Sequence, residues 1–412
     1  MRAGSGRIWL AGLLVMVALL ALAGCGAVGP NQWQTVGPGG APITALATDP
    51  HVPGIIYAGG SDGATYLARG DHSGVFAPST THPSSGPVNI IFPNPDSDGV
   101  VYAGTAGGFY ASGDYGQHYT AHNSGLPSGA NITAITTTSD ASTLIISVTQ
   151  KGFYTSDDGG KNWRAIPATS GPLPANATVQ ALLWDGAAKA LYAAVSDVAS
   201  GIYVSRDAGA TWSHDDTGLP PKTNAYALAT LTPGASATPA APATPATPAT
   251  PATPASPGTT LFAGTSAGVY ARAAGAKTTG AATWQSVGTD LPPGTVYALA
   301  TFAATPDTLY AGVGQTVFSS SDGGQHWKQV ANDLEHAAVA LAVTPGQHAP
   351  VVAFVAAGQI ARYPAQQGSG DSSVEGTILA AIVIGLMGWY VLGHYHIVPS
   401  MADVRRRITR RR

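Results

Sequence analysis

Short runs in which apolar and polar residues alternate recur between residues 33 and 363, which is the pattern of half-buried β-strands. The most regular run begins Tyr-Ala-Gly, and its first residue recurs as Tyr57, Tyr102, Ile145, Tyr192, Phe262, Tyr310 and Val352. These positions are 42–48 residues apart, except for one interval of 70. That interval holds the Ala-Thr-Pro run Ala237–Pro257, and removing residues 234–258 restores a spacing of 45. Seven such units predict an all-β fold, a seven-bladed β-propeller.

Each unit has room for four strands. A first strand such as Ile43-Thr-Ala-Leu precedes the Tyr-Ala-Gly strand, a Gly-Phe-Tyr strand follows it, and a hairpin then leads to a tryptophan that opens the fourth. The seventh unit lacks this last piece. Trp33-Gln-Thr-Val36 matches Trp284-Gln-Ser-Val287 at the start of a fourth strand, so we expect the N-terminal strand to close the last blade and remove an open sheet edge.

The hairpin before the tryptophan carries a motif, Ser-x-Asp-x-Gly-x-x-Trp. Its copies are Ser112, Asp114, Gly116 and Tyr119; Ser156, Asp158, Gly160 and Trp163; Ser205, Asp207, Gly209 and Trp212; and Ser320, Asp322, Gly324 and Trp327. It resembles the Asp-box (BNR) repeat of sialidases, sortilin-type receptors, xyloglucanases and the photosystem II assembly-factor family. The resemblance covers roughly residues 33–363 and implies a propeller fold. We expect Ser and Asp to cap a tight turn and Trp to pack against the blade, so these aspartates are structural rather than catalytic.

Both ends of the chain have the composition of membrane signals. Residues 1–25 resemble a lipoprotein signal peptide: an apolar run from Ile8 to Leu22 ends at Cys25, the only cysteine, which predicts lipidation there. At the other end, Thr377–Val398 has no Asp, Glu, Lys or Arg and predicts a transmembrane helix. The arginine-rich residues 399–412 would then form a cytoplasmic tail and residues 365–376 a linker. The predicted location is the cell membrane, with the propeller at 31–364, including a disordered insert at 234–258, on the extracytoplasmic side.

Composition restricts the possible partners and chemistry. Charged residues make up 10% of the chain and its net charge is −3, so no basic surface for nucleic acid is expected. No zinc-ligand spacing, phosphate-binding loop or nucleophile elbow occurs, and we expect neither a cofactor nor a metal. The resemblance to sialidases would require a cluster of arginines, yet Arg69, Arg206 and Arg272 fall in hairpins between third and fourth strands.

Propeller topology places the Asp-box hairpins and both anchors on one face. The opposite face is built from turns such as 59–64, 195–201 and 265–268, together with the Gly-Leu-Pro loops, and propellers usually bind ligands there. The carboxylates expected near this face are Asp62, Asp197, Asp215, Asp216, Asp290, Asp333 and Glu335.

We therefore expect a membrane-anchored, non-catalytic module that binds or scaffolds an envelope protein or a glycan. A glycoside hydrolase that uses two of the outward aspartates stays open, because that chemistry needs only a pair of carboxylates. An assembly factor for a membrane complex, by resemblance to the photosystem II family, is the third possibility.

Overall fold

The computed structural model describes residues 34–362, apart from 36, 39, 70–75, 139–142, 168–171, 232–258, 274–282, 302–306, 331–337, 339, 345–351 and 357–359. The described residues form strands and one short 3-10 helix, η1 (Asp197–Ala199). The first strands are β2 (Ile43–Thr48), β6 (Val88–Pro93), β10 (Ile132–Thr137), β14 (Thr178–Asp185), β18 (Ala225–Leu231), β22 (Val296–Thr301) and β26 (Ala340–Thr344). The second strands are β3 (Ile56–Gly60), β7 (Val101–Thr105), β11 (Leu144–Val148), β15 (Ala190–Ser196), β19 (Thr260–Thr265), β23 (Leu309–Val313) and β27 (Val352–Ala356).

The third strands are β4 (Thr65–Ala68), β8 (Gly108–Ser112), β12 (Gly152–Ser156), β16 (Gly201–Ser205), β20 (Gly268–Ala273), β24 (Thr316–Ser320) and β28 (Ile360–Arg362). The fourth strands are short: β5 (Phe76–Pro78), β9 (Thr120–Ala121), β13 (Arg164–Ala165), β17 (Ser213–His214), β21 (Gln285–Ser286), β25 (Lys328–Gln329) and β1 (Gln34–Thr35).

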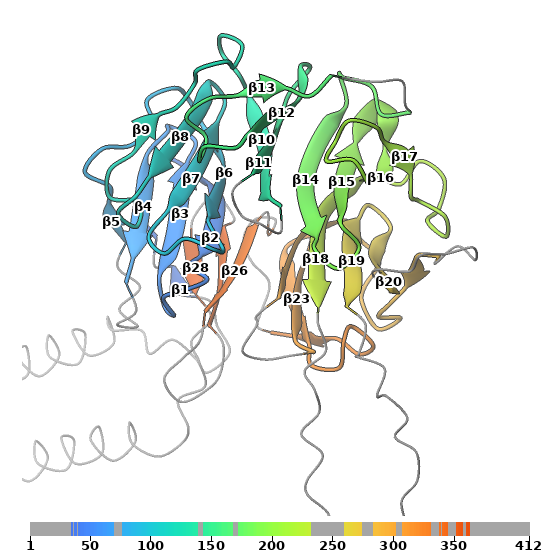
Figure 1. Cartoon of the computed structure of the whole chain (residues 1–412). Helices are drawn as coiled ribbons and strands as arrows, with labels where there is room; N and C mark the ends of the chain where they lie inside the picture. The colour runs from blue at the N-terminus through green and yellow to red at the C-terminus, as the bar shows by residue number, and fades with distance from the viewer. Residues whose placement is uncertain are drawn as a thin grey trace, which may run out of the picture. The chain divides into compact units, whose positions relative to one another are not determined.

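These strands make seven antiparallel four-stranded sheets, in the arrangement of a β-propeller. Six sheets contain four consecutive strands each, whereas the remaining one is composite: β1 pairs with β28, with Gln34 opposite Arg362 and Thr35 opposite Ala361. Figure 1 shows β1, β26 and β28 together, although they come from opposite ends of the described chain. The first strands contact one another in sequence, and β26 contacts β2, so the ring is closed.

The fold class predicted from the sequence, which joined a seven-bladed propeller to a transmembrane helix, is wrong as stated. Within the described part of the chain no helix is long and apolar enough to cross a membrane, and η1 has only three residues. The transmembrane helix was predicted from the hydropathy of Thr377–Val398. That segment lies outside the described residues. Residues 1–25 with Cys25, the insert at 234–258, the linker at 365–376 and the tail at 399–412 also lie outside them.

The second strands β3, β7, β11, β15 and β23 form a buried layer in their sheets. Every residue of β3, β7, β11, β15 and β23 is buried, because both faces of these strands pack against neighbouring sheets. Their aromatic residues include Tyr57 and Tyr192, each only 1% exposed.

The glycine of the Tyr-Ala-Gly repeat has a steric role. A Cβ atom at Gly59 would lie 2.5 Å from Cγ1 of Val88, and one at Gly104 would lie 2.7 Å from Cγ2 of Ile132. Gly264 and Gly312 face the next blade in the same way, at 2.9 Å from Val296 Cγ1 and 2.8 Å from Ala338 Cβ. Each glycine therefore gives the first strand of the following sheet room to approach the second strand.

We expect Gly104→Ala to lower the free energy of unfolding by about 1–3 kcal/mol, because the new methyl group overpacks a filled interface. Its nearest neighbours would be Ile132 and Ile90, at 2.7 and 2.8 Å. Gly113→Ala is the matched control, because no heavy atom lies within 4 Å of its Cβ position. Urea unfolding of both variants measures the difference, and equal midpoints would contradict the steric role.

Candidate functional site

Six first strands carry a β-bulge near their start, where the pairing with the second strand skips one position. The skipped residues are Thr44, Asn89, Thr133, Gln180, Tyr226 and Tyr297, which we call the bulge ring. A bulge redirects a side chain out of the regular pattern and is frequent beside binding sites. The bulges lie next to the ends of the second strands, hence at the second-to-third-strand turns where the sequence analysis expects a binding face.

Hydrogen bonds join the bulge ring from one blade to the next. The Thr44 hydroxyl donates to the carbonyl of Val88 at 2.6 Å. The Asn89 amide donates to the carbonyl of Ile132 at 2.9 Å and to Oδ1 of Asn131 at 2.8 Å. Because Val88 and Ile132 directly precede the next bulges, these bonds hold successive ring positions at the same level.

Two tyrosines form the aromatic part of the ring. The rings of Tyr226 and Tyr297 are neighbours, with centroids 5.1 Å apart and planes inclined by 55°. Tyr297 is 39% exposed, and the only other large hydrophobic residue this exposed in the described chain is Val198, at 73%, in the turn after β15. Both lie on the face of the second-to-third-strand turns.

The remaining ring positions carry hydroxyl and amide groups and no charge. Gln180 is exposed, and its Nε2 donates to the Ser196 hydroxyl at 2.8 Å. None of the six ring residues was predicted from the sequence as part of a site. A signal was present, since each follows the first buried residue of its first strand, but strict alternation does not show where a bulge shifts the register.

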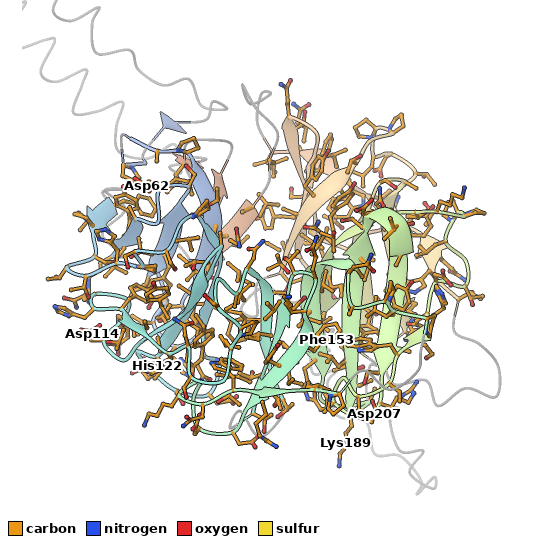
Figure 2. All side chains as sticks on the ribbon, turned by 90° about the horizontal axis from the view of Figure 1, so that it is seen from above. Asp62, Asp114, His122, Phe153, Lys189 and Asp207 are labelled. Atoms are coloured by element: carbon orange, nitrogen blue, oxygen red, sulfur yellow. The ribbon has the colours of Figure 1, made fainter. Side chains whose placement is uncertain are left out.

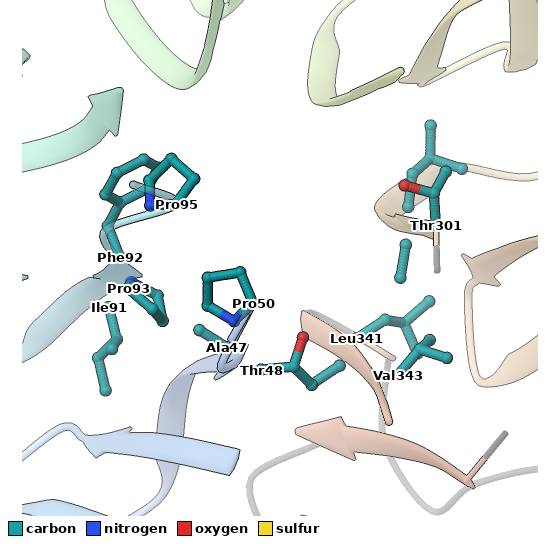
Figure 3. Close-up of a pocket in the computed structure, with 13 residues that line it drawn as sticks. Ala47, Thr48, Pro50, Ile91, Phe92, Pro93, Pro95, Thr301, Leu341 and Val343 are labelled. Carbon is teal, nitrogen blue, oxygen red and sulfur yellow. The ribbon is translucent and has the colours of Figure 1, made fainter. Parts of the chain in front are cut away.

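An apolar cavity of about 330 Å³ lies where four first strands end (Figure 3). It is lined by Ala47, Thr48, Pro50, Ile91, Phe92, Pro93, Pro95, Leu299, Ala300, Thr301, Leu341, Ala342 and Val343. None of these lining residues has an acid, a base or a thiol, so the cavity lacks the groups that acid–base or nucleophilic chemistry requires.

Each predicted Ser-x-Asp motif forms a compact turn, which we call a Ser-Asp turn. In the second turn the Ser156 hydroxyl donates to Oδ1 of Asp158 at 2.7 Å and accepts the Gly160 N–H at 2.9 Å. Asp158 also accepts the backbone N–H and the side-chain amide of Asn162, at 3.0 and 2.8 Å. Gly160 has a φ of +85°, which favours glycine.

The other three turns repeat the bond between serine and aspartate. It joins Ser112 to Asp114 at 2.8 Å, Ser205 to Asp207 at 2.7 Å and Ser320 to Asp322 at 2.8 Å. The glycine N–H donates to the same serine hydroxyl, from Gly116 at 3.0 Å, Gly209 at 2.7 Å and Gly324 at 2.8 Å. Figure 2 shows Asp114 and Asp207 near the edge of the molecule on different blades, so these carboxylates do not converge on one site.

The aromatic residue that ends each turn packs between blades. Tyr119, Trp163, Trp212 and Trp327 are 4–8% exposed. The backbone N–H of Trp163 donates to the Ser124 carbonyl of the preceding blade at 2.8 Å, and that of Trp284 donates to Thr217 in the same way at 2.8 Å. Ser124 and Thr217 are each followed by a Gly-Leu-Pro loop, so each of these loops starts at a hydrogen bond between two blades.

The Ser-Asp turns stabilise the charged form of their carboxylates. Burial opposes the shift at Asp114, but hydrogen bonds from His118 and Ser112 lower its pKa to about 2. Hydrogen bonds from Asn162 lower the pKa of Asp158, and those from His326 lower the pKa of Asp322. The pKa of Asp207 is also lowered, by Thr211 and Ser205 against the effect of burial.

We expect these four carboxylates to make the fold sensitive to acid. Their pKa values are depressed in the folded chain, so the unfolded chain takes up protons first, and stability falls as pH drops from 3.8 toward 2. Urea unfolding at a series of pH values measures this. Asp158→Asn keeps an acceptor but cannot titrate, so its stability should fall less steeply with pH; an unchanged slope would contradict the assignment.

Three of the outward aspartates predicted from the sequence have separate partners in the structure. Oδ1 of Asp62 accepts the N–H of Ala64 at 3.0 Å. Asp216 lies 3.4 Å from Nδ1 of His214, and Oδ2 of Asp290 accepts the N–H of Trp327 at 2.8 Å. Asp197 begins η1. Asp333 and Glu335 lie outside the described residues.

The carboxylates of Asp49 and Asp98 lie together with His51, their ligand atoms within 4.8 Å of one another. Buried Asp49 accepts the Tyr57 hydroxyl at 2.6 Å and the N–H groups of His51 and Val52 at 2.8 Å each. Burial and Asp49 raise the pKa of Tyr57, so its phenol stays protonated and is a poor nucleophile. These bonds occupy the Asp49 carboxylate, which we interpret as a structural cap.

The remaining outward aspartate that the structure describes, Asp215, forms a buried ion pair with Arg272. The sequence predicted Arg272 in a hairpin between the third and fourth strands, but it lies in the third strand itself, β20. It occupies the position at which other blades have the serine of the Ser-Asp turn. It also donates to the Tyr192 hydroxyl at 2.9 Å and lies 5.4 Å from the ring of Trp284. Arg272 therefore ties its blade to the preceding one.

We expect Arg272→Met to destabilise the fold by about 3–5 kcal/mol, because it leaves Asp215 buried and unpaired. The Arg272 and Asp215 side chains are 9% and 18% exposed, and burial already raises the pKa of Asp215. The double variant Asp215→Leu with Arg272→Met removes both charges and should lose less stability. A single variant as stable as the native chain in urea would contradict this role.

No protein-family profile matches the chain, and no curated protein matches its sequence. Among solved structures, the GH74 xyloglucanase from Xanthomonas campestris aligns with a TM-score of 0.57 at 16% identity, over 84% of this chain and 55% of that one. YCF48 from Cyanidioschyzon merolae aligns with a TM-score of 0.54 at 12% identity, over 80% and 98%. The extracellular domain of a hybrid two component system from B. thetaiotaomicron gives 0.53 at 10%, over 81% and 39%.

These similarities show the fold alone, because every identity is low. The chain is a β-propeller protein, and it spans about half the length of the GH74 xyloglucanase it matches. A further YCF48 structure contains a bound D1 peptide.

Proposed function

We propose that this chain is a non-catalytic binding module of the Asp-box (BNR) type, and that its ligand, an envelope protein or a glycan, binds over the bulge ring. The single observation that carries the proposal is the set of six bulges, which direct side chains out of six first strands on one face. The exposed Tyr297 and Val198 on this face add apolar contact area.

A non-catalytic role is favoured over a glycoside hydrolase by the partners of the carboxylates. A glycosidase needs two carboxyl groups that flank one bond. Asp62, Asp215 and Asp290 each have a different structural partner, on different blades.

An assembly factor is the alternative that the YCF48 structures favour, since one of them holds a peptide. Such a role would use the same face with a protein partner. It differs from the leading proposal in the ligand and not in the site.

The site is tested by adding a bulky charge to the bulge ring. Gln180→Arg should lower the binding of any ligand found on glycan or peptide arrays by at least tenfold, because its long side chain covers the ring. Gln325→Arg introduces the same residue in the Ser-Asp turn that begins at Ser320, and it should bind like the native chain. Equal binding by both variants would refute the site, and turnover of a glycan by the native chain would refute the non-catalytic role.

We further propose that the propeller lies outside the cytoplasm and is anchored by lipid on Cys25. The single cysteine of the sequence, placed directly after an apolar N-terminal run, supports this.

Metabolic labelling with a fatty-acid probe tests the anchor. The native chain should be labelled and Cys25→Ser should not, with the variant shifting to the soluble fraction. Equal labelling of the two would refute the anchor.

A further inference from the structure

The bulge ring is chemically uneven around its circumference. Aromatic side chains occupy two successive blades, at Tyr226 and Tyr297. The four preceding blades carry Thr44, Asn89, Thr133 and Gln180, which offer hydroxyl and amide groups. A ligand that covers this ring meets a stacking surface on one side and neutral hydrogen-bonding groups on the other.

The aromatic side is open to a ligand. Tyr297 is 39% exposed and Tyr226 is half-buried beside it, with ring centroids 5.1 Å apart. The first-strand positions just before the bulges, Ala225 and Val296, are fully buried. The backbone that carries the two tyrosines is therefore well packed, so a ligand that stacks on them need not order that backbone.

Neutrality is the second informative feature. None of the six ring residues carries a charge, and a ligand rich in carboxylate or phosphate would be recognised best by arginine. The ion-paired Arg272 is bound to Asp215 and Tyr192, away from the ring. The ring is thus suited to an uncharged ligand with hydroxyl groups and an apolar face.

We propose that the bulge ring binds a neutral glycan, with the C–H face of a sugar ring stacked on Tyr297 and Tyr226, and with sugar hydroxyls bonded by the Gln180 amide and donating to Oδ1 of Asn89, whose amide N–H groups are already bonded. Pyranose rings have such a face, and amide side chains both donate and accept hydrogen bonds. This inference rests on the proposed binding role of the ring and specifies its ligand.

Titration calorimetry of the full-length chain tests the inference, with neutral β-1,4-linked hexasaccharides of glucose and of N-acetylglucosamine as probes and oligogalacturonate as the anionic comparison. We expect binding of a neutral hexasaccharide and at least tenfold weaker binding of oligogalacturonate. Tyr297→Ala should weaken the neutral interaction about tenfold, whereas Tyr297→Phe, which keeps the ring, should retain it. Thermal unfolding checks that both variants are folded.

Three results would overturn the inference. They are preference for the anionic oligomer, equal affinity of Tyr297→Ala and the native chain, and absence of binding to both neutral probes. If the neutral probes fail but a peptide binds and Gln180→Arg abolishes that binding, the ring is a protein-binding site, and the proposed function stands without the glycan. If no ligand responds to Gln180→Arg, the proposed function fails as well.

Discussion

The close approach of four first strands to the second strand of the preceding sheet is the constraint on which this part of the ring depends. At Gly59, Gly104, Gly264 and Gly312 a single Cβ would overlap the next blade. Because interiors are close-packed, this contact sets the spacing between sheets. It also sets the level of the bulges, since Val88, Ile132 and Val296 pack on these glycines directly before a bulged residue.

The Ser-Asp turns and the proposed binding residues occupy different parts of the same blade. The carboxylates of the Ser-Asp turns accept backbone N–H groups within their own hairpins and stay ionised for that purpose. Six first strands instead carry neutral hydroxyl, amide and tyrosine side chains at their bulges. Because the Ser-Asp turns hold the hairpins without using the ring residues, the ring residues can differ from blade to blade. Such variation is expected of functional positions on a repeated scaffold.

The blade of β18–β21 shows that the frame can be held in a second way. Arg272 takes the place of the turn serine and bonds across to Asp215 and Tyr192, while Trp284 keeps the inter-blade position of Trp163. A buried ion pair is costly to desolvate, so it contributes to this interface only while both partners are present. The same blade contributes Tyr226, so this long-range contact supports one half of the aromatic surface.

The repeated short strands and the four Ser-Asp turns could be predicted from the sequence, because both depend on residues that are neighbours in the chain. Pairing of Gln34 and Thr35 with β28 could also be inferred, from the match between Trp33 and Trp284. The bulge ring could not be inferred from the sequence. Which residue of a first strand is skipped depends on how that strand pairs with the second strand and packs on the preceding blade. Tyr226 and Tyr297 are 71 residues apart in sequence, and they come to share one surface only in the folded chain, because equivalent positions of different blades meet when the ring forms.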